Sequence, residues 1–275
     1  MNVVYRYRFN KRLSRWQDLI IVTLLLTACA VSPTGRQQTI LFDERQLAAM
    51  GQRAMAQYQA EKPTSSSGQV NRYVECVARA ITATVPSGPS GWQVTVFKDP
   101  TPNAFALPGG KIGVHTGLLE VAQTQDQLAA VIGHEVGHVL ARHANERISQ
   151  QMLASTGIQI LGGVAGAQYG ASVGIEWQRY APLLTQVAIL LPYSRIHETE
   201  ADQIGLGLMA RAGFDPRAAV TLWQAMSQKG SSQTIEFLST HPSNATRINA
   251  IAAQIPQVLP LYQQVLARGI QPRCA

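Results

Sequence analysis

The sequence predicts an α+β domain that is mostly helical and carries a small β-sheet. Two observations support this expectation. Short apolar or alternating runs between residues 92 and 115 have the pattern of strands, and the chain after residue 124 has the apolar spacing of helices almost to its end. With 275 residues and 46% apolar content, the chain is long enough to bury one core, and no internal repeat is visible.

The first 28 residues predict a signal peptide. They hold five basic side chains and one acid, and they end in a ten-residue apolar run from Leu19, too short to span a membrane. The run closes with Leu26-Thr27-Ala28-Cys29, which resembles the bacterial lipobox, so we expect Cys29 to be lipidated. The alternative is a buried cysteine in a first helix. By the sorting rule of the lipoproteins that this segment resembles, Ala30 rather than Asp after the lipidated cysteine favours the outer membrane, where we expect the lipid-anchored protein to face the periplasm.

The charge distribution argues against one class of partner. Five of the 23 basic and one of the 16 acidic residues lie in residues 1–28, which leaves a formal charge of only +3 for the rest. No stretch there clusters Lys and Arg with interleaved aromatic residues, as binding to phosphates requires. Nucleic acid is therefore not an expected partner.

Each element after the signal peptide has its own pattern. Residues 29–42 show no periodicity and predict a membrane tether, whereas Leu47, Met50, Ala54 and Tyr58 recur at helical spacing. Turn-forming residues separate the next elements. We expect helices at 43–62, 69–84, 124–151, 175–191, 194–212, 216–228 and 243–255, and strands at 92–97, 104–107 and 111–115.

Two segments of the helical part have distinctive compositions. Thr124 and Gln127 have the spacing of a capping box, which predicts where the long helix begins. The Gly- and Ala-rich segment 157–174 is interrupted by Gln159, Gln168 and Tyr169, so we expect a loosely packed helix rather than a membrane span.

The long helix contains a metal-binding pattern, His134-Glu135-Val136-Gly137-His138. Residues at i and i+4 share one helix face, so both imidazoles can reach one Zn²⁺, while Glu135 lies beside the open coordination position. The bland alternative is a pair of surface histidines, but the residues before His134 are apolar around much of the helix. A catalytic zinc site is therefore predicted, and it needs a third protein ligand.

The third ligand is expected on a later helix. Glu198 and Asp202 are separated by four residues and face the same way, whereas Glu200 points elsewhere. We therefore predict Glu198 as the ligand, with Asp202 accepting the free N–H of a ligating histidine. Glu200 is expected to be a solvated charge.

These motifs resemble the signatures of a known family of zinc metallopeptidases. His134–His138 and Ser194–Asp202 resemble the HExxH and SRxxExEAD signatures of the zinc metallopeptidases that include HtpX-like, CAAX prenyl, mitochondrial Oma-type and periplasmic BepA- and LoiP-like proteases. Asn103–Gly117 resembles the family's strand segment, and Ser239–Ile248 resembles its SxHPxxxRI motif. The chain lacks multiple membrane spans and a tetratricopeptide array, so the small LoiP-like branch is the nearest match. A zincin-like domain over residues 43–275 is implied.

The resemblance also assigns roles. It makes Glu198 the ligand, gives Asp202 a proton-donor or orienting role, and places His241 near the zinc as a transient ligand or a donor to the developing oxyanion. A helix-capping role for His241 is the alternative. Arg247, in the same motif, is expected to support the ligands. The remaining histidines have no ligand spacing: His143 is expected at the surface, and His115 and His197 are expected to be structural.

The predicted function is zinc-dependent endopeptidase activity in the bacterial envelope, on misfolded or damaged outer-membrane and periplasmic proteins. Zinc lowers the pKa of bound water to about 7 and Glu135 takes its proton. The strand Asn103, Ala104, Phe105, Ala106 and Leu107 is expected to pair with the backbone of unfolded substrates. The alternative is a chaperone or assembly factor with a structural zinc; an autoinhibited protease closed by segment 157–174 or His241 is a third possibility. Outer-membrane assembly machinery or other envelope proteases are candidate partners.

Two cysteines remain after Cys29. An even number in an oxidising compartment permits one disulfide, between Cys76 and Cys274. The alternative is two free thiols, because spacing in the sequence does not establish proximity.

Overall fold

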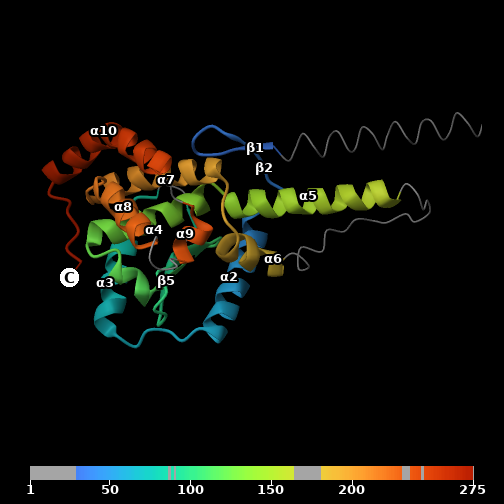
Figure 1. Cartoon of the computed structure of the whole chain (residues 1–275), viewed down its shortest axis with the longest axis horizontal. Coiled ribbons are helices and arrows are strands. Elements are labelled where there is room, and N and C mark those ends of the chain that lie inside the picture. Colours follow the sequence, from blue (N-terminus) through green and yellow to red (C-terminus); the bar gives the residue numbers. More distant parts are fainter. Residues whose placement is uncertain are drawn as a thin grey trace, which may run out of the picture.

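The computed structural model describes residues 29–85, 88–89, 91–163, 181–230, 236–242 and 245–274. Within these residues the protein is mostly helical with small sheets, as predicted (Figure 1). The predicted signal peptide lies outside the described residues, as do residues 164–174 of the Gly-rich segment and residues 175–180 of the helix expected at 175–191.

The three predicted strands form one sheet. β3 (Gln93–Phe97) runs parallel to β5 (Lys111–His115), which pairs antiparallel with β4 (Ala104–Leu107). The strand order is β3-β5-β4, so β4 is an edge strand. The turn between β4 and β5 uses Gly109 and Gly110, both with positive φ, which glycine adopts without a steric penalty.

Two helices precede the sheet, close to their predicted bounds. α2 (Glu44–Glu61) begins with a capping box between Asp43 and Gln46, and α3 (Gly68–Thr82) is capped by Ser67. The apolar face of α3 packs into a core with the sheet and α4. Tyr58 of α2 packs edge-on against the rings of Phe97 and Phe105 in a second core.

The long helix expected at 124–151 is two helices. α4 (Gln125–Leu140) ends at Ala141, and α5 (His143–Gly163) extends away from the body (Figure 1). Between them Arg142 has a φ of 54°, a left-handed conformation that is uncommon for residues other than glycine. No Gly or Pro marks this break, so the helical pattern alone could not predict it. Its effect is to turn His143 back toward α4.

α7 (Arg195–Ala212) packs closely on α4. A Cβ atom added to Gly137 would lie 2.8 Å from the backbone oxygen of Ala201, and one added to Gly205 would lie 2.9 Å from the backbone nitrogen of His134. Neither glycine therefore has room for a side chain. The two backbones approach each other at the level of His134–His138, which brings Glu198 of α7 to the metal-binding pattern of α4.

Further helices complete the body. α8 (Ala218–Gly230) lies near its predicted place, whereas the short α9 (Glu236–Thr240) was not predicted. α10 (Ala245–Ala267) is longer than the helix expected at 243–255, since it continues through Pro256 and Pro260. The 175–191 segment is described only from α6 (Ala181–Thr185), followed by the π-helical turn η3 (Gln186–Leu190). The short 3-10 helix η1 (Thr116–Glu120) links the sheet to α4.

Residues 29–42, which we expected to be a tether without regular structure, pack on the body. β1 (Cys29–Val31) and β2 (Gln37–Thr39) form an antiparallel hairpin beside α5 and α7 (Figure 1). The side chain of Gln38 is buried and donates to the backbone oxygen of Ala141, at the end of α4. A sequence without periodicity is thus ordered by tertiary contacts.

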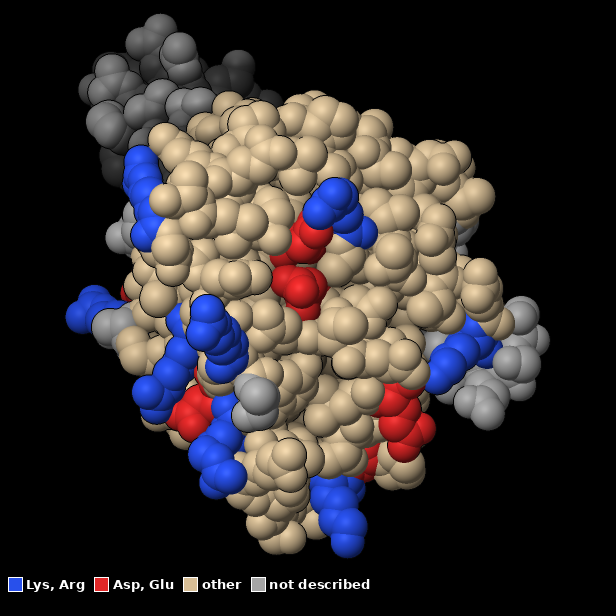
Figure 2. Space-filling view, turned by 90° about the vertical axis from the view of Figure 1, so that its left-hand side faces the viewer, with Lys and Arg blue, Asp and Glu red and all other residues tan. Residues whose placement is uncertain are grey.

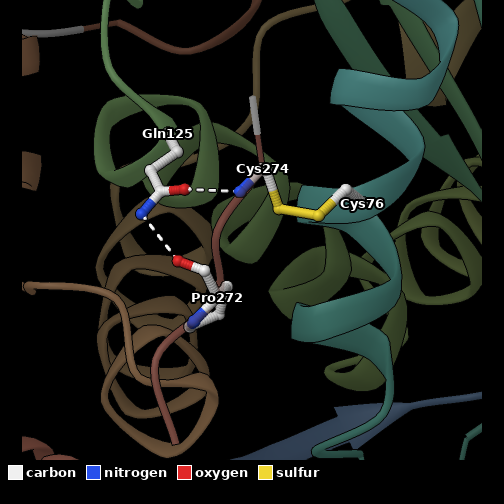
Figure 3. The surroundings of a disulfide bond; sticks show 4 residues. All are labelled: Cys76, Gln125, Pro272 and Cys274. Atoms are coloured by element: carbon white, nitrogen blue, oxygen red, sulfur yellow. Dashed lines mark hydrogen bonds between the residues drawn. A yellow bond between two sulfur atoms is a disulfide. The ribbon is translucent and has the colours of Figure 1, made fainter.

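The C-terminal segment is joined to α3 by a disulfide between Cys76 and Cys274, whose Cα atoms are 5.6 Å apart (Figure 3). Gln125 at the start of α4 adds two hydrogen bonds. It accepts from the backbone N–H of Cys274 and donates to the carbonyl of Pro272, each at 3.0 Å. The last residues after α10 are therefore tied to both α3 and α4.

Charged side chains on one side of the molecule are dispersed. On the face that is on the left in Figure 1, acidic side chains and an adjoining basic one lie near the centre, most other Lys and Arg lie toward the border, and uncharged surface separates them (Figure 2). Among the described helices, none combines the length and the hydropathy needed to cross a membrane.

Candidate metal centre

α4 and α7 bring three predicted ligands together. The Nε2 atoms of His134 and His138 are 3.0 Å apart, and the carboxylate oxygens of Glu198 lie 3.4 Å and 3.3 Å from them. Three ligand atoms at tetrahedral positions around one zinc ion are separated by about 3.3 Å, given zinc–nitrogen bonds of about 2.0–2.1 Å. All three side chains are buried. The arrangement therefore fits one zinc ion.

His241, just after α9, completes the cluster. Its Nδ1 atom lies 3.1 Å from Nε2 of His134 and 3.0 Å from Glu198, and the ligand atoms of the four residues all lie within 4.8 Å of one another. The ring of Phe237 stacks on the His241 ring, with centroids 4.4 Å apart. The structure thus places His241 among the ligands. Its Nδ1 atom would compete with water for a fourth coordination position.

Glu135 lies beside the cluster but points to a different partner. One carboxylate oxygen accepts a hydrogen bond from the backbone N–H of Ala106 in β4, at 3.2 Å. The other is buried without a hydrogen bond from any described residue, and Nε2 of His241 lies 3.3 Å from it. Burial raises the pKa of Glu135 above its ordinary value, since an ionised carboxylate loses hydration there. A carboxylate with a raised pKa is suited to accept a proton.

His134 has the support that the sequence predicts. Its Nδ1 atom lies 2.9 Å from Asp202, and Arg247 donates two hydrogen bonds to the same carboxylate at 2.8 Å and 2.9 Å. Burial alone would raise the pKa of Asp202, but the charges and hydrogen bonds of Arg247 and His134 lower it. Arg247 also pairs with Glu198 at 2.5 Å and covers the ring of Trp223. Arg247 therefore contacts both the predicted ligand Glu198 and Asp202, which supports the predicted ligand His134.

The electrostatics of the cluster favour a cation. Burial lowers the pKa of His134, but the carboxylates of Glu198 and Asp202 outweigh it and raise this pKa to about 9. Two carboxylates therefore favour positive charge at the point where the imidazoles meet. Imidazole nitrogens and carboxylate oxygens are the donor set of catalytic zinc sites. The chemistry of the residues thus agrees with their geometry.

Two predictions about residues near the site are wrong. His143, expected at the surface, is fully buried, and Glu200, expected to be solvated, is 4% exposed. The prediction for His143 assumed one continuous helix, on which this residue would face away from the ligands. Because α4 ends before His143, the side chain can reach the site. Glu200 is covered by the β1–β2 hairpin, whose packing the sequence did not indicate. His115 and His197 are buried away from the ligands, at Tyr58 and Glu146 respectively.

The predicted substrate strand is also buried. The five residues Asn103–Leu107 are at most 4% exposed, although β4 is an edge strand. Phe105 and Leu107 pack in one cluster with Leu184 of α6 and with Val187 and Ile189 of η3. A cavity of about 20 Å³ lies beside β4 and the ligand His138, and Ala106 and Tyr193 also line it. It has room for about one water molecule and none for a peptide.

Comparison with known proteins places this geometry in a family. The model of peptidase family M48 matches residues 64–255, which include all the ligands described above. The chain belongs to peptidase family M48. It is 37% identical to the mitochondrial metalloendopeptidase OMA1 of Schizosaccharomyces pombe, over 78% of this chain and 62% of that protein. It is 30% identical to human metalloendopeptidase OMA1 over 92% of this chain and 52% of that protein.

A bacterial relative is more distant. The beta-barrel assembly-enhancing protease of Escherichia coli is 25% identical over 78% of this chain and 45% of that protein. The chain thus spans between 45% and 62% of the length of these three relatives. Homology to both the Oma-type and the assembly-enhancing proteases was predicted from the motifs. The narrower LoiP-like assignment is not among these findings.

The predicted localisation, lipid-anchored in the outer membrane and facing the periplasm, is contradicted. The relatives with 35–37% identity are mitochondrial by name. The physical reason for the error is that a basic, acid-poor N-terminus is shared by secretory and mitochondrial targeting segments. The lipobox resemblance rests on four residues. Lipidation of Cys29 stays a prediction, because nothing of its side chain is described.

Some contributors to the site were missed at the sequence level. Tyr193 places its ring 4.0 Å from that of His138, and Arg36 of the hairpin pairs with Glu200. The one signal for His143 is its spacing, five residues after His138. Nothing in the sequence indicates that Arg36 lies near Glu200, since 164 residues separate them.

Proposed function

We propose that this protein is a zinc-dependent endopeptidase that cleaves extended segments of misfolded or damaged proteins. The observation that carries the proposal is Glu135, which lies against the ligand cluster, is no ligand itself, and has one buried oxygen without a hydrogen bond from the described residues. A purely structural zinc site needs no such base.

The residues divide the chemistry between them. His134, His138 and Glu198 would hold zinc, which when bound supplies a Lewis acid that acidifies a water and polarises the scissile carbonyl. Glu135 accepts the proton of the attacking water and returns it to the leaving amine. Asp202 and Arg247 keep His134 oriented. His241 lies close enough to stabilise the oxyanion or, in the resting protein, to act as a fourth ligand.

β4 is the proposed substrate-binding strand. Along β4, the residues whose backbone groups bond β5 alternate with Ala104 and Ala106, whose backbone groups are directed to the free edge. The N–H of Ala106 donates to Glu135 there. A substrate strand added at this edge would run past the catalytic base. Because η3 packs over β4 and the adjoining cavity is small, the described form is closed. We therefore propose that η3 and His241 must move before cleavage, so that the resting enzyme is autoinhibited.

The substrate class is inferred from the binding mode and the relatives. Pairing through the backbone selects extended chains with little regard to side chains, which suits unfolded proteins. The relatives of Yersinia pestis and Escherichia coli are named for enhancing beta-barrel assembly, which supports proteins of the bacterial envelope as substrates.

The decisive experiment compares wild type with Glu135→Gln. We expect both proteins to bind one zinc ion per chain, measured by elemental analysis, and only the wild type to digest casein in a chelator-sensitive way. A glutamine preserves the hydrogen bond from Ala106 but accepts no proton. Undiminished cleavage by Glu135→Gln would refute the mechanism. An assembly factor would be favoured instead if the wild type cleaved nothing and if both the wild type and Glu135→Gln suppressed the aggregation of an unfolded protein.

A further inference from the structure

The Nδ1 atom of His138, the ring nitrogen that does not meet the other ligands, has an unusual partner. His134 meets a carboxylate at its Nδ1 atom, but Nδ1 of His138 lies 2.8 Å from Nδ1 of His143, another imidazole. Nε2 of His143 lies 3.1 Å from Glu200. His138, His143 and Glu200 therefore form a continuous buried chain that leads away from the metal centre.

The proton positions along this chain follow from the ligand role of His138. A ligating Nε2 atom has no proton, so neutral His138 carries its proton on Nδ1 and donates it to Nδ1 of His143. His143 then carries its own proton on Nε2 and donates it to Glu200. Each ring thereby has one defined tautomer, and the chain ends on an ionised carboxylate.

Glu200 is held in that state by the N-terminal hairpin. Arg36 donates to Glu200 through Nε at 2.9 Å, and Thr34 donates to the other carboxylate oxygen at 2.5 Å. The hairpin therefore supplies the positive charge that pairs with the carboxylate at the end of the chain.

Arg36 is itself fixed by a second carboxylate. Its two terminal nitrogens donate to both oxygens of Glu146 at 2.7 Å, a bidentate pair. Gln38 of β2 also donates to Glu146, at 2.9 Å, and to the end of α4. The guanidinium thus joins α5 to α7 at the point where α4 ends. Arg36 and Thr34 lie outside the region matched by the family model.

We propose that the β1–β2 hairpin is part of the metal centre: Arg36, through Glu200 and His143, positions His138 for zinc. This inference rests on the zinc site of the proposed function. His143, Glu200 and Arg36 are positioning residues, since none of them touches the metal or the substrate. A residue that is hydrogen-bonded to a metal ligand changes the affinity for the metal, because it sets the orientation and basicity of that ligand.

The first test is the zinc dissociation constant, measured by competition with a chromogenic chelator. We expect His143→Phe to weaken zinc binding about 10- to 100-fold and Arg36→Met to weaken it about 3- to 10-fold, with Arg36→Lys between Arg36→Met and wild type. His115→Phe is the matched control. His115 is also fully buried, but its hydrogen-bond partners are Tyr58 and Thr101, which lie outside the chain from His138 to Arg36. It should leave the constant unchanged.

The second test separates positioning from general loosening. In the zinc-loaded wild type, the Nδ1 protons of both ligand histidines should give downfield proton resonances that exchange slowly with water. Arg36→Met should speed exchange of the His138 proton and leave that of His134 unaffected, because Asp202 holds His134 independently. A structural defect would accelerate both.

The outcomes of the two proposals are distinguishable. A wild type that binds zinc but cleaves nothing would overturn the proposed function and leave the hairpin inference open to both measurements. Equal zinc affinity of wild type, His143→Phe and Arg36→Met would overturn the inference, as would an equal loss in the His115→Phe control.

Discussion

His134 and His138 lie one turn apart on α4, yet the protein supports them in different ways. His134 contacts the carboxylate of Asp202 directly, and Arg247 caps that carboxylate. His138 reaches its carboxylate, Glu200, only through the ring of His143, and Arg36 caps it. The order of groups is otherwise the same: ligand, anion, arginine.

The inserted imidazole changes the electrostatics. Burial lowers the pKa of both ligands. At His134 the charges of Glu198 and Asp202 outweigh it, whereas at His138 burial and the positive charges of His134 and His143 outweigh Glu198 and keep the pKa well below its ordinary value. An imidazole passes on a hydrogen bond but adds no negative charge beside the ligand. The comparison teaches that a direct carboxylate strengthens a ligand electrostatically, while a relayed one mainly sets its orientation and tautomer.

The largest expected effect separates a ligand from a support on the same helix. Glu198→Ala should abolish stoichiometric zinc binding, because Glu198 contacts both histidines and its removal leaves Arg247 less well paired. Glu200→Gln, two residues away, should keep stoichiometric zinc. Elemental analysis after dialysis provides the readout. Retained zinc in Glu198→Ala would show that His241 is the third ligand.

The next effect ranks the two supports. Asp202→Asn should weaken zinc binding about 10- to 100-fold, since it removes the charge next to His134 and leaves the buried Arg247 partly uncompensated. Glu200→Gln should weaken it less, about 3- to 10-fold, because one ring separates it from the ligand. Chelator competition measures both constants. The distinction between direct and relayed support fails if Glu200→Gln costs as much affinity as Asp202→Asn.

The disulfide offers a variant that acts on the fold without touching either support. Cys76→Ser combined with Cys274→Ser should lower the free energy of unfolding by about 2–5 kcal/mol, because the bond spans 198 residues and constrains the unfolded chain. Zinc affinity at 25 °C should be unchanged. Urea denaturation and chelator competition on the same sample test this. A parallel loss of zinc affinity would mean that the supports respond to global stability.

The smallest effect concerns a buried histidine that has no ligand role. Burial lowers the pKa of His115, so the unfolded chain binds more protons below about pH 6.5, and stability should fall as the pH drops through that value. His115→Gln should show a shallower loss between pH 7 and pH 5 in urea titrations. Zinc release contributes equally to both proteins, so the difference in slope reports His115. Identical slopes would contradict the assigned pKa direction.

The site shows how far local pattern reasoning extends. The i, i+4 geometry of an α-helix was sufficient to predict His134 with His138 and Glu198 with Asp202, because a regular helix places such pairs on one face. The strands at 92–97, 104–107 and 111–115 agree with the structure to within one residue. The same reasoning failed for His143, because it assumed a helix that continues past Arg142.

The sequence by itself thus determined the fold class, the main elements and the family, since helical and strand periodicities and the ligand spacings are local properties of the chain. Only the tertiary structure decided that α4 ends at Leu140, that residues 29–39 form a hairpin, and that Arg36 reaches Glu200 across 164 residues. Such contacts depend on which surfaces remain to be covered once the helices have packed. A buried carboxylate requires a cation from whichever segment lies nearby, and separation along the chain does not indicate which segment that is.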